Sequence, residues 1–375
     1  MARPPASGLI SIVLPDLGGG GAERLHLNLA AAWLRAGHQV EFVLMRREGE
    51  LLGLLPAGAT VWDLGADRIR SAIPPLRRYL RERLPSVTLA AMWPLTSAAT
   101  IAWILAGRIG KLFLSDHVQL SLDRRAEAGT NPTLLKYSIR RTYPAATGII
   151  AVSNGVKADL CALGALRPDS VSVIYNPAAI ECGGPAADAN LRLSLWGAHD
   201  GFNVLAVGKL KPEKDYATLL RAFALLPPGF CARLAIVGDG PLRQDLSDLK
   251  ERLGLGASVR FAGFAIDPTD WYRTADVFVL SSRLEGFGNV IVEALSFGLP
   301  VISTDCPCGP SEILERGRYG VLVPMNDPPA LARAIQTTRD APRNPEPLVL
   351  RSRDFAVDTI AIQYLDVFGM GGRGH

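Results

Sequence analysis

A short unit between residues 275 and 303 constrains the fold more than any other part of the sequence. An apolar run at residues 275–280 has the length of a buried strand, and residues 290–297 form an almost entirely apolar segment of helical length that ends at a Gly-Leu-Pro stop. A second apolar strand is expected at residues 300–303. Strand, helix and strand in this order form one right-handed crossover of a doubly wound parallel sheet, so we expect an α/β fold.

Two carboxylates flank the glycine turn of this unit. Glu285 stands before Gly286, Phe287 and Gly288, and Glu293 is the only charge of its helix. The N-terminus of a helix attracts anions such as phosphate, and a carboxylate among apolar neighbours is costly unless something pairs with it. The pattern indicates a phosphate cradle between two acids that accept hydrogen bonds from sugar hydroxyls. In the alternative interpretation, Glu293 pairs within the fold and Glu285 is an exposed loop acid.

Two lysines follow the strand expected at residues 203–207. Lys209 and Lys214 lie at the turn before a helix expected at residues 216–226, where they can neutralise a diphosphate as point charges. The alternative is a solvated, lysine-rich loop.

The N-terminal strand, turn and helix resemble a dinucleotide site only superficially. Glu23 occupies the position where a third glycine would complete G-x-G-x-x-G, so that motif fails, although Arg46 and Arg47 could mimic a 2′-phosphate pocket. A nicotinamide enzyme is therefore disfavoured.

The chain resembles a known family in several segments. EGFGNVIVEALSFGLPVI, which contains Glu285 and Glu293, resembles the paired-glutamate motif of the family 4 retaining glycosyltransferases, enzymes of the GT-B fold. DCPCGPSEIL and GRYGVLVPMND are similar to the subgroup that moves N-acetylhexosamines, such as N-acetylgalactosamine, or hexoses onto lipid-linked or polysaccharide acceptors. GGGGAERLHLNLA and IAVSNGVKADL resemble the family's N-terminal domain.

The resemblance implies two Rossmann-like, doubly wound domains that face a cleft. Residues 1–180 would bind the acceptor, with a C-terminal helix at residues 354–375 crossing back to them. Residues 191–353 would bind the nucleotide-sugar. The small, aperiodic stretch at residues 181–190 is the expected linker.

The resemblance also implies roles for particular residues. The catalytic candidates are Glu285, His117 and Lys214. The donor-binding candidates are Lys209, Lys214, Gly286, Phe287, Gly288, Asn289, Glu293, Gly18, Gly19 and Gly20. The family usually has arginine where this chain has Lys209, which keeps the charge but loses the bidentate fork. His117 follows a strand expected at residues 112–115, and its alternative role is a structural bond to Asp116.

The cysteines predict neither disulfides nor a metal centre. All five are scattered, and the spacing of Cys306 and Cys308 is wrong for a zinc site. No cofactor is expected, because the nucleotide-sugar is a substrate. Residues 1–8 do not form a secretory signal, which indicates a cytoplasmic setting. The uncharged residues 86–107 contain a proline and several threonines, so we expect a strand, a turn and a buried helix rather than a membrane span.

The charge is unevenly distributed. Residues 1–180 carry 20 Lys and Arg against 13 Asp and Glu, a net charge of +7, whereas the rest carries 20 against 23. Residues 68–83 contain six of these cations, namely Arg68, Arg70, Arg77, Arg78, Arg81 and Arg83. This basic segment suits an anionic membrane surface on the inner face of the cytoplasmic membrane, or it is an ordinary solvated helix. Nucleic acid is disfavoured, because no aromatic platform accompanies the charge.

These features, together with the resemblance, predict a retaining, metal-independent glycosyltransferase. It would move a hexose or N-acetylhexosamine from a nucleoside-diphosphate sugar, probable nucleotide UDP, to a lipid-linked glycan or polysaccharide precursor. No protein nucleophile is evident, so the resemblance implies same-face attack with the leaving phosphate as base. The alternatives are a sugar-nucleotide epimerase or isomerase on the same fold and a non-catalytic sugar-nucleotide-binding protein.

Overall fold

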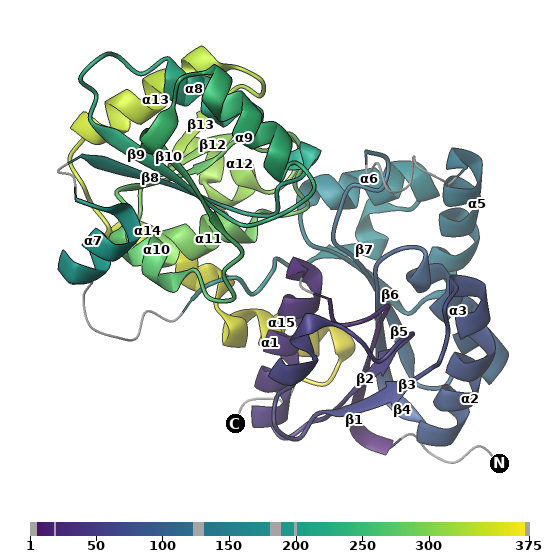
Figure 1. The fold of residues 1–375 in the computed structure, drawn as a ribbon. Helices are drawn as coiled ribbons and strands as arrows, with labels where there is room; N and C mark the ends of the chain where they lie inside the picture. The colour runs from purple at the N-terminus through teal and green to yellow at the C-terminus, as the bar shows by residue number, and fades with distance from the viewer. Residues whose placement is uncertain (1–5, 19, 123–130, 181–188, 199–200, 372–375) are drawn as a thin grey trace. The chain divides into compact units, whose positions relative to one another are not determined.

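The computed structural model describes residues 6–18, 20–122, 131–180, 189–198 and 201–371 (Figure 1). It divides into two compact units. Unit 1 comprises Met1–Pro177 and Ala356–His375, and unit 2 comprises Ala178–Phe355. Each unit contains one parallel sheet with its own apolar core.

Unit 1 is built on a seven-stranded sheet in the order β3-β2-β1-β4-β5-β6-β7. In chain order, its strands are β1 (Ala6–Leu14), β2 (Gln39–Leu44), β3 (Thr60–Asp63), β4 (Pro85–Ala91), β5 (Lys111–Asp116), β6 (Gly148–Ala151) and β7 (Val171–Val173). Its helices are α1 (Gly21–Arg35), α2 (Ile73–Arg83), α3 (Leu95–Ala106), α5 (Pro132–Thr142), α6 (Asn154–Gly164) and α15 (Val357–Phe368). Helices α1 and α15 cover one face of the sheet, and α2 and α3 cover the other (Figure 1).

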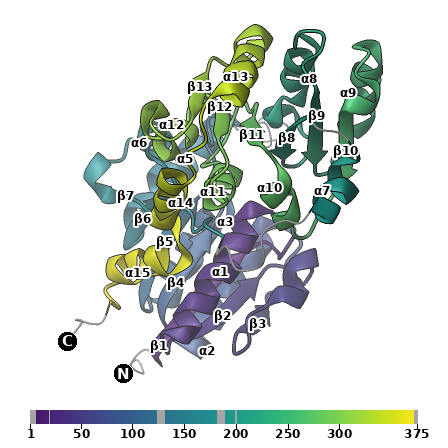
Figure 2. The same ribbon diagram turned by 90° about the vertical axis from the view of Figure 1, so that its left-hand side faces the viewer.

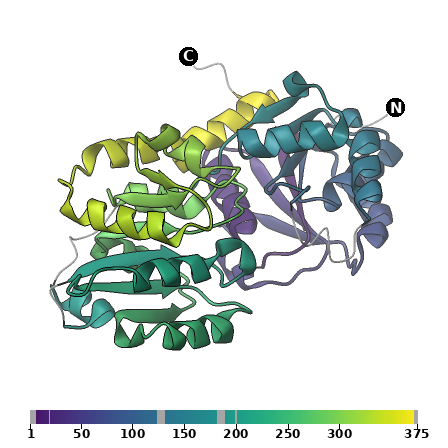
Figure 3. The same cartoon turned by 90° about the horizontal axis from the view of Figure 1, so that it is seen from above.

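Unit 2 is built on a six-stranded sheet in the order β10-β9-β8-β11-β12-β13. Its strands are β8 (Phe202–Val207), β9 (Ala232–Val237), β10 (Val259–Gly263), β11 (Val277–Leu280), β12 (Val301–Thr304) and β13 (Val321–Val323). Its helices are α7 (Ala189–Trp196), α8 (Tyr216–Ala224), α9 (Arg243–Arg252), α10 (Thr269–Thr274), α11 (Asn289–Ser296), α12 (Pro310–Ile313), α13 (Pro328–Asp340) and α14 (Glu346–Ser352). Helices lie on both faces of this sheet (Figure 1 and Figure 3).

The unit that led the sequence analysis folds as expected. Strand β11 pairs in parallel with β12, Phe278 opposite Val301, and α11 forms the crossover between them. The expected α/β class and the two doubly wound sheets are confirmed. Strand β4 and helix α3 account for most of residues 86–107. Within the described ranges, no helix is both long and apolar enough to cross a membrane.

The C-terminal helix returns to unit 1 and completes its core. Helix α15 lies against α1 (Figure 2), where the Trp33 indole donates to the carbonyl of Ala361 at 3.1 Å and contacts the ring of Tyr364. Phe368 packs against Phe113 of β5, with ring centroids 4.8 Å apart. The crossing of this helix is confirmed.

Three boundaries differ from the expectation. The helix predicted from residue 354 begins at Val357, because Arg353–Phe355 form a turn of 3₁₀ helix. The stretch expected to be irregular after residue 341 contains the start of α14. Residues 181–188 of the expected linker lie outside the described residues, and its last two residues are the first turn of α7.

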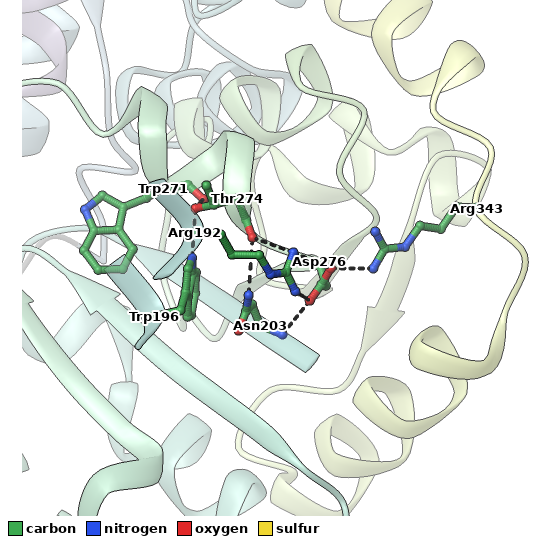
Figure 4. Close-up of polar contacts among 7 residues, drawn as sticks. All are labelled: Arg192, Trp196, Asn203, Trp271, Thr274, Asp276 and Arg343. Atoms are coloured by element: carbon green, nitrogen blue, oxygen red, sulfur yellow. Dashed lines mark hydrogen bonds and ion pairs between the residues drawn. The ribbon is translucent and has the colours of Figure 1, made fainter. Parts of the chain in front are cut away.

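A buried carboxylate ties the amino ends of β8 and β11 to two distant segments (Figure 4). Asp276 accepts from Arg192 and from Arg343, each at 2.7 Å, and from the backbone N–H of Asn203 at 2.8 Å. Burial alone would raise the pKa of Asp276, but these hydrogen bonds outweigh burial and hold the pKa below its usual value. The cluster lies at the sheet edge opposite the carboxyl ends of the strands.

Candidate active site

The carboxyl ends of β8 and β11 bring a lysine and a glutamate together. The Nζ atom of Lys214, in the turn after β8, lies 2.6 Å from Oε1 of Glu285, in the turn after β11. The hydroxyl of Ser282 donates to the same carboxylate oxygen at 2.6 Å. Only 22% of the Lys214 side chain and 9% of the Glu285 side chain are exposed. An ammonium has three donors, so Lys214 can bind Glu285 and a phosphate at once.

Main-chain contacts hold these two turns in place. The hydroxyl of Ser281 donates to the carbonyl of Lys214 at 2.8 Å. The N–H of Arg283 donates to the carbonyl of Glu213 at 2.7 Å. The Lys214–Glu285 pair is therefore positioned by the backbone as well as by its own attraction. Lys209, five residues before Lys214, is exposed.

The glycine turn before α11 is held from behind by the loop that follows β12. Gly288 is the N-cap of α11 and adopts φ +100°, and Asn289 is the first helical residue. Gly309 packs so closely on the turn that a Cβ atom there would lie 1.6 Å from the carbonyl oxygen of Phe287. The N-terminus of α11, where the helix dipole is positive, thus lies at the same sheet edge as Glu285.

Glu293 has a donor within the fold. The hydroxyl of Tyr272 donates to Oε2 of Glu293 at 2.7 Å, and the ring of Tyr272 stacks on Phe297 with centroids 5.6 Å apart. Burial and the neighbouring Glu293 raise the pKa of Tyr272, so it remains a donor. A carboxylate accepts at two oxygens, so this bond orients Glu293 and is compatible with a second contact to a ligand.

His117 lies at the carboxyl end of β5 in unit 1. Its Nε2 atom lies 3.3 Å from the hydroxyl of Ser115. Asp116, its expected structural partner, instead accepts from the hydroxyl of Tyr143 at 2.6 Å and from the N–H of Trp93 at 3.0 Å. Burial raises the pKa of Asp116 to about 6.

A second histidine contacts His117. The ring of His26, on α1, meets the ring of His117 edge-on with centroids 5.3 Å apart, and Nδ1 of His26 lies 2.7 Å from the carbonyl of Ala22. Burial lowers the pKa of His26 to about 4, and burial together with His26 lowers the pKa of His117 to about 3. Both rings are therefore neutral near pH 7.

The glycine turn of unit 1 precedes α1. The N–H of Gly18 donates to Asp16 at 2.9 Å, and Gly20 is the N-cap of α1, whereas Gly19 lies outside the described residues. Arg46 forms ion pairs with Asp16 at 3.6 Å and with Glu48 at 3.0 Å. These carboxylates neutralise the cation that the dinucleotide interpretation requires for a 2′-phosphate.

Three contact residues of the site were not predicted. Ser282 and Tyr272 carry no spacing signal in the sequence. His26 carries a weak one, because it precedes the buried Leu29 and Ala30 by three and four residues and so shares their helix face. No group of three or more metal-ligating side chains occurs among the residues that the structure describes. The buried thiol of Cys306 has its pKa raised to about 12, first by burial and then by Glu285.

Two doubly wound parallel sheets, with a basic turn and paired acids at the carboxyl edge of the second, define a GT-B protein. A family model described as Glycosyltransferase Family 4 matches residues 19–181, and one described as Glycosyl transferases group 1 matches residues 201–340. The lipopolysaccharide core biosynthesis glycosyltransferase LpsD of Rhizobium meliloti is 30% identical over 362 residues, which are 94% of this chain and 96% of that protein. The chain belongs to glycosyltransferase family 4 and is a glycosyltransferase.

Two further relatives place this membership in context. The N-acetylgalactosamine-N,N'-diacetylbacillosaminyl-diphospho-undecaprenol 4-alpha-N-acetylgalactosaminyltransferase of Campylobacter jejuni is 30% identical over 207 residues, 55% of this chain and 54% of that protein. The crystal structure of Anabaena HepE in complex with UDP and glucose has a TM-score of 0.80 over 96% of this chain and 99% of that chain, at 22% identity. This structural likeness shows the fold.

Proposed function

We propose that this glycosyltransferase transfers a hexose or N-acetylhexosamine from a UDP-sugar to a lipid-linked glycan or polysaccharide precursor, with retention and without a metal ion. The observation that carries the proposal is the Lys214–Glu285 pair, 2.6 Å apart, in front of the glycine turn of α11. This arrangement offers a cation for a diphosphate and an acceptor for sugar hydroxyls side by side. The names of the relatives support the substrate class, because one acts in lipopolysaccharide core biosynthesis and another on a diphospho-undecaprenol acceptor.

The proposed binding roles follow from the chemistry of each group. Lys209, Lys214 and the N-terminus of α11 hold the diphosphate and stabilise its charge as it leaves, an electrostatic contribution that is often the largest in catalysis. Glu285 accepts hydrogen bonds from the donor sugar, and Glu293, oriented by Tyr272, accepts them from the ribose. Gly18, Gly19 and Gly20 would let the backbone approach the donor phosphates or the acceptor.

The proposed reaction needs no protein nucleophile. The acceptor oxygen attacks the anomeric carbon on the face that the diphosphate leaves. The carbon–oxygen bond to the phosphate breaks, and the acceptor proton moves to the departing phosphate oxygen. His117 is neutral near pH 7, so it can exchange hydrogen bonds with a hydroxyl of the reacting sugar without adding charge.

The proposal assigns the acceptor to residues 1–180 with the C-terminal helix, and the donor to residues 191–353, with residues 181–190 as the linker. We place the enzyme in the cytoplasm, where nucleotide-sugars are made.

The first test measures nucleotide release from a panel of UDP-, GDP- and ADP-sugars, with and without a polyprenyl-diphosphate-sugar acceptor. Wild type is compared with Glu293→Gln and with Glu251→Gln, a control at an exposed carboxylate of α9. We expect acceptor-dependent release from a UDP-sugar that Glu293→Gln lowers at least tenfold, that Glu251→Gln leaves intact and that a chelator does not change.

Other results would support the alternatives. Conversion of a UDP-sugar to its epimer without release would indicate an epimerase. Tight binding of a UDP-sugar without turnover, with every acceptor offered, would indicate a binding protein. Loss of activity with a chelator, restored by a divalent cation, would contradict the metal-independent mechanism.

A further inference from the structure

Helix α3, which the sequence predicts to be buried, has an exposed apolar stripe. Ile101, Ile104 and Leu105 follow one another at helical spacing and are between 40% and 51% exposed. The opposite side of α3 is buried, and α3 lies beside α2 on one face of the sheet of unit 1 (Figure 1). The stripe therefore faces away from the sheet.

Arginines border this stripe. The guanidinium of Arg77, on α2, donates to the carbonyl of Leu105 at 3.1 Å, and that of Arg81 donates to the carbonyls of Leu105 and Ala106 at 3.3 and 3.4 Å. Arg108, just after α3, lies over the ring of Trp103 with 5.7 Å between its Cζ atom and the ring centroid. All three arginines are exposed as residues. Because two of them bind the end of α3 itself, their charges stay beside the apolar stripe.

The remaining charges of α2 are partly used within unit 1. Arg83 pairs with the buried Glu41 at 3.0 Å, and Arg78 pairs with Glu82, one turn further along the helix, at 2.7 Å. Residues 68–83 therefore do not present six equivalent cations to solvent. The basic and apolar surface that the structure builds, the α2–α3 face, consists of Ile101, Ile104, Leu105, Arg77, Arg81 and Arg108.

We propose that the α2–α3 face docks on an anionic lipid bilayer. The three aliphatic side chains enter the headgroup region, and the three arginines contact lipid phosphates around them. This combination favours a membrane, because each cation near an anionic leaflet strengthens binding by about fivefold and aliphatic side chains gain from leaving water. Nucleic acid would use the cations but not the aliphatic stripe.

The inference deepens the proposed function, because docking would bring the enzyme to a lipid-linked acceptor. It can be tested without turnover. The full-length chain is sedimented with vesicles of phosphatidylcholine alone and of phosphatidylcholine mixed with phosphatidylglycerol. We expect binding to the anionic vesicles that weakens as salt is added, and little binding to the neutral ones.

The decisive comparison uses two matched double variants. Ile101→Glu with Ile104→Glu is expected to reduce binding to anionic vesicles at least tenfold. Leu225→Glu with Leu350→Glu, at exposed leucines of unit 2, is expected to leave it unchanged. Circular dichroism and thermal unfolding check that both variants are folded. Equal binding by the two variants, or wild type remaining in the supernatant, would overturn the inference.

Two further readouts separate the inference from other outcomes. If the Ile101→Glu and Ile104→Glu variant changes only the mass of the protein in solution, the partner of this face is a second copy and the inference fails. Nucleotide release with a soluble, short-chain acceptor is expected to be the same in this variant as in wild type. Absent release with intact vesicle binding would contradict the proposed function alone.

Discussion

Lys214 and Glu285 neutralise each other in the ligand-free site, so each restrains the other's charge and geometry. Replacing Lys214 with methionine leaves the nearly buried Glu285 with only the hydroxyl of Ser282 as a side-chain donor. Removing one partner of a buried pair leaves an uncompensated charge, and we expect Lys214→Met to lower the free energy of unfolding by about 2 kcal/mol. Urea unfolding measures this loss.

The double variant Lys214→Met with Glu285→Gln separates stability from function. The neutral amide needs no cation, so we expect most of the lost stability to return. Nucleotide release is expected to stay as low as in Lys214→Met, because the cation for the diphosphate is still missing. A double variant no more stable than Lys214→Met would show that the pair is not the source of the loss.

The buried histidines predict a pH dependence of stability. The pKa of His26 falls from 6.5 to about 4 on folding, so protons bind preferentially to the unfolded chain. Stability is therefore complete above about pH 6.5 and decreases as the pH falls toward about 4. His26→Gln keeps a donor for Ala22 but does not titrate. Between about pH 7 and about pH 5, we expect its free energy of unfolding to fall by about 2 kcal/mol less than that of wild type.

Denaturant unfolding at a series of pH values tests this dependence. His38→Gln, at a partly exposed histidine, is the matched control and is expected to follow wild type. Parallel curves for wild type and His26→Gln would mean that His26 is not the titrating group.

At the scale of elements, the sequence predicts what apolar runs and stop signals encode. The unit of β11, α11 and β12 is predicted to within two residues, because both strands are buried and a Gly-Leu-Pro stop ends the helix. Strand β3 is not predicted, since it has four residues, none of them buried, and a run that short has no readable period. Helix α14 is missed because Pro347, which suggests a break, lies in the first turn, where proline is tolerated.

The candidate site was predictable only in part for a related reason. The types and positions of Lys214, Glu285 and Glu293 follow from turns after apolar strands. The contact between Lys214 and Glu285 joins residues 71 positions apart and depends on β8 lying next to β11, which local spacing does not encode. The pairing of Tyr272 with Glu293 depends on packing in the same way.

The glycine turn before α11 depends on a second element, the loop that contains Gly309. Gly309 and Gly317 both have positive φ, +86° and +100°, but only Gly309 is crowded. Alanine at Gly317 is expected to cost about 1 kcal/mol, the usual strain of a left-handed residue. Alanine at Gly309 must also displace the carbonyl of Phe287, and we expect it to cost more than about 2 kcal/mol.

Binding of UDP provides the second readout of this comparison. Gly309→Ala is expected to weaken it at least tenfold, because the turn before α11 moves, whereas Gly317→Ala leaves it unchanged. Equal effects of the two substitutions on UDP binding would show that crowding at Gly309 does not position the turn.

At the scale of the whole molecule, each unit has its own sheet and core, and α15 belongs to the first of them. We therefore expect two transitions in calorimetry rather than one. Asp276→Asn removes the charge that Arg192 and Arg343 share, which is expected to lower the transition of unit 2 by several degrees. Trp33→Phe leaves a cavity and an unpaired carbonyl at Ala361 between α1 and α15, which is expected to lower the transition of unit 1 by a similar amount.

The two substitutions act as controls for each other. Because the Asp276 cluster lies at the sheet edge opposite Lys214 and Glu285, Asp276→Asn is also expected to keep wild-type nucleotide release at temperatures where unit 2 is folded. If each substitution lowered both transitions equally, the two cores would unfold as one cooperative unit. Separate shifts would show that the returning helix stabilises the unit it packs on, so that the two chain crossings near Pro177 and Ala356 divide the protein into independently stable halves.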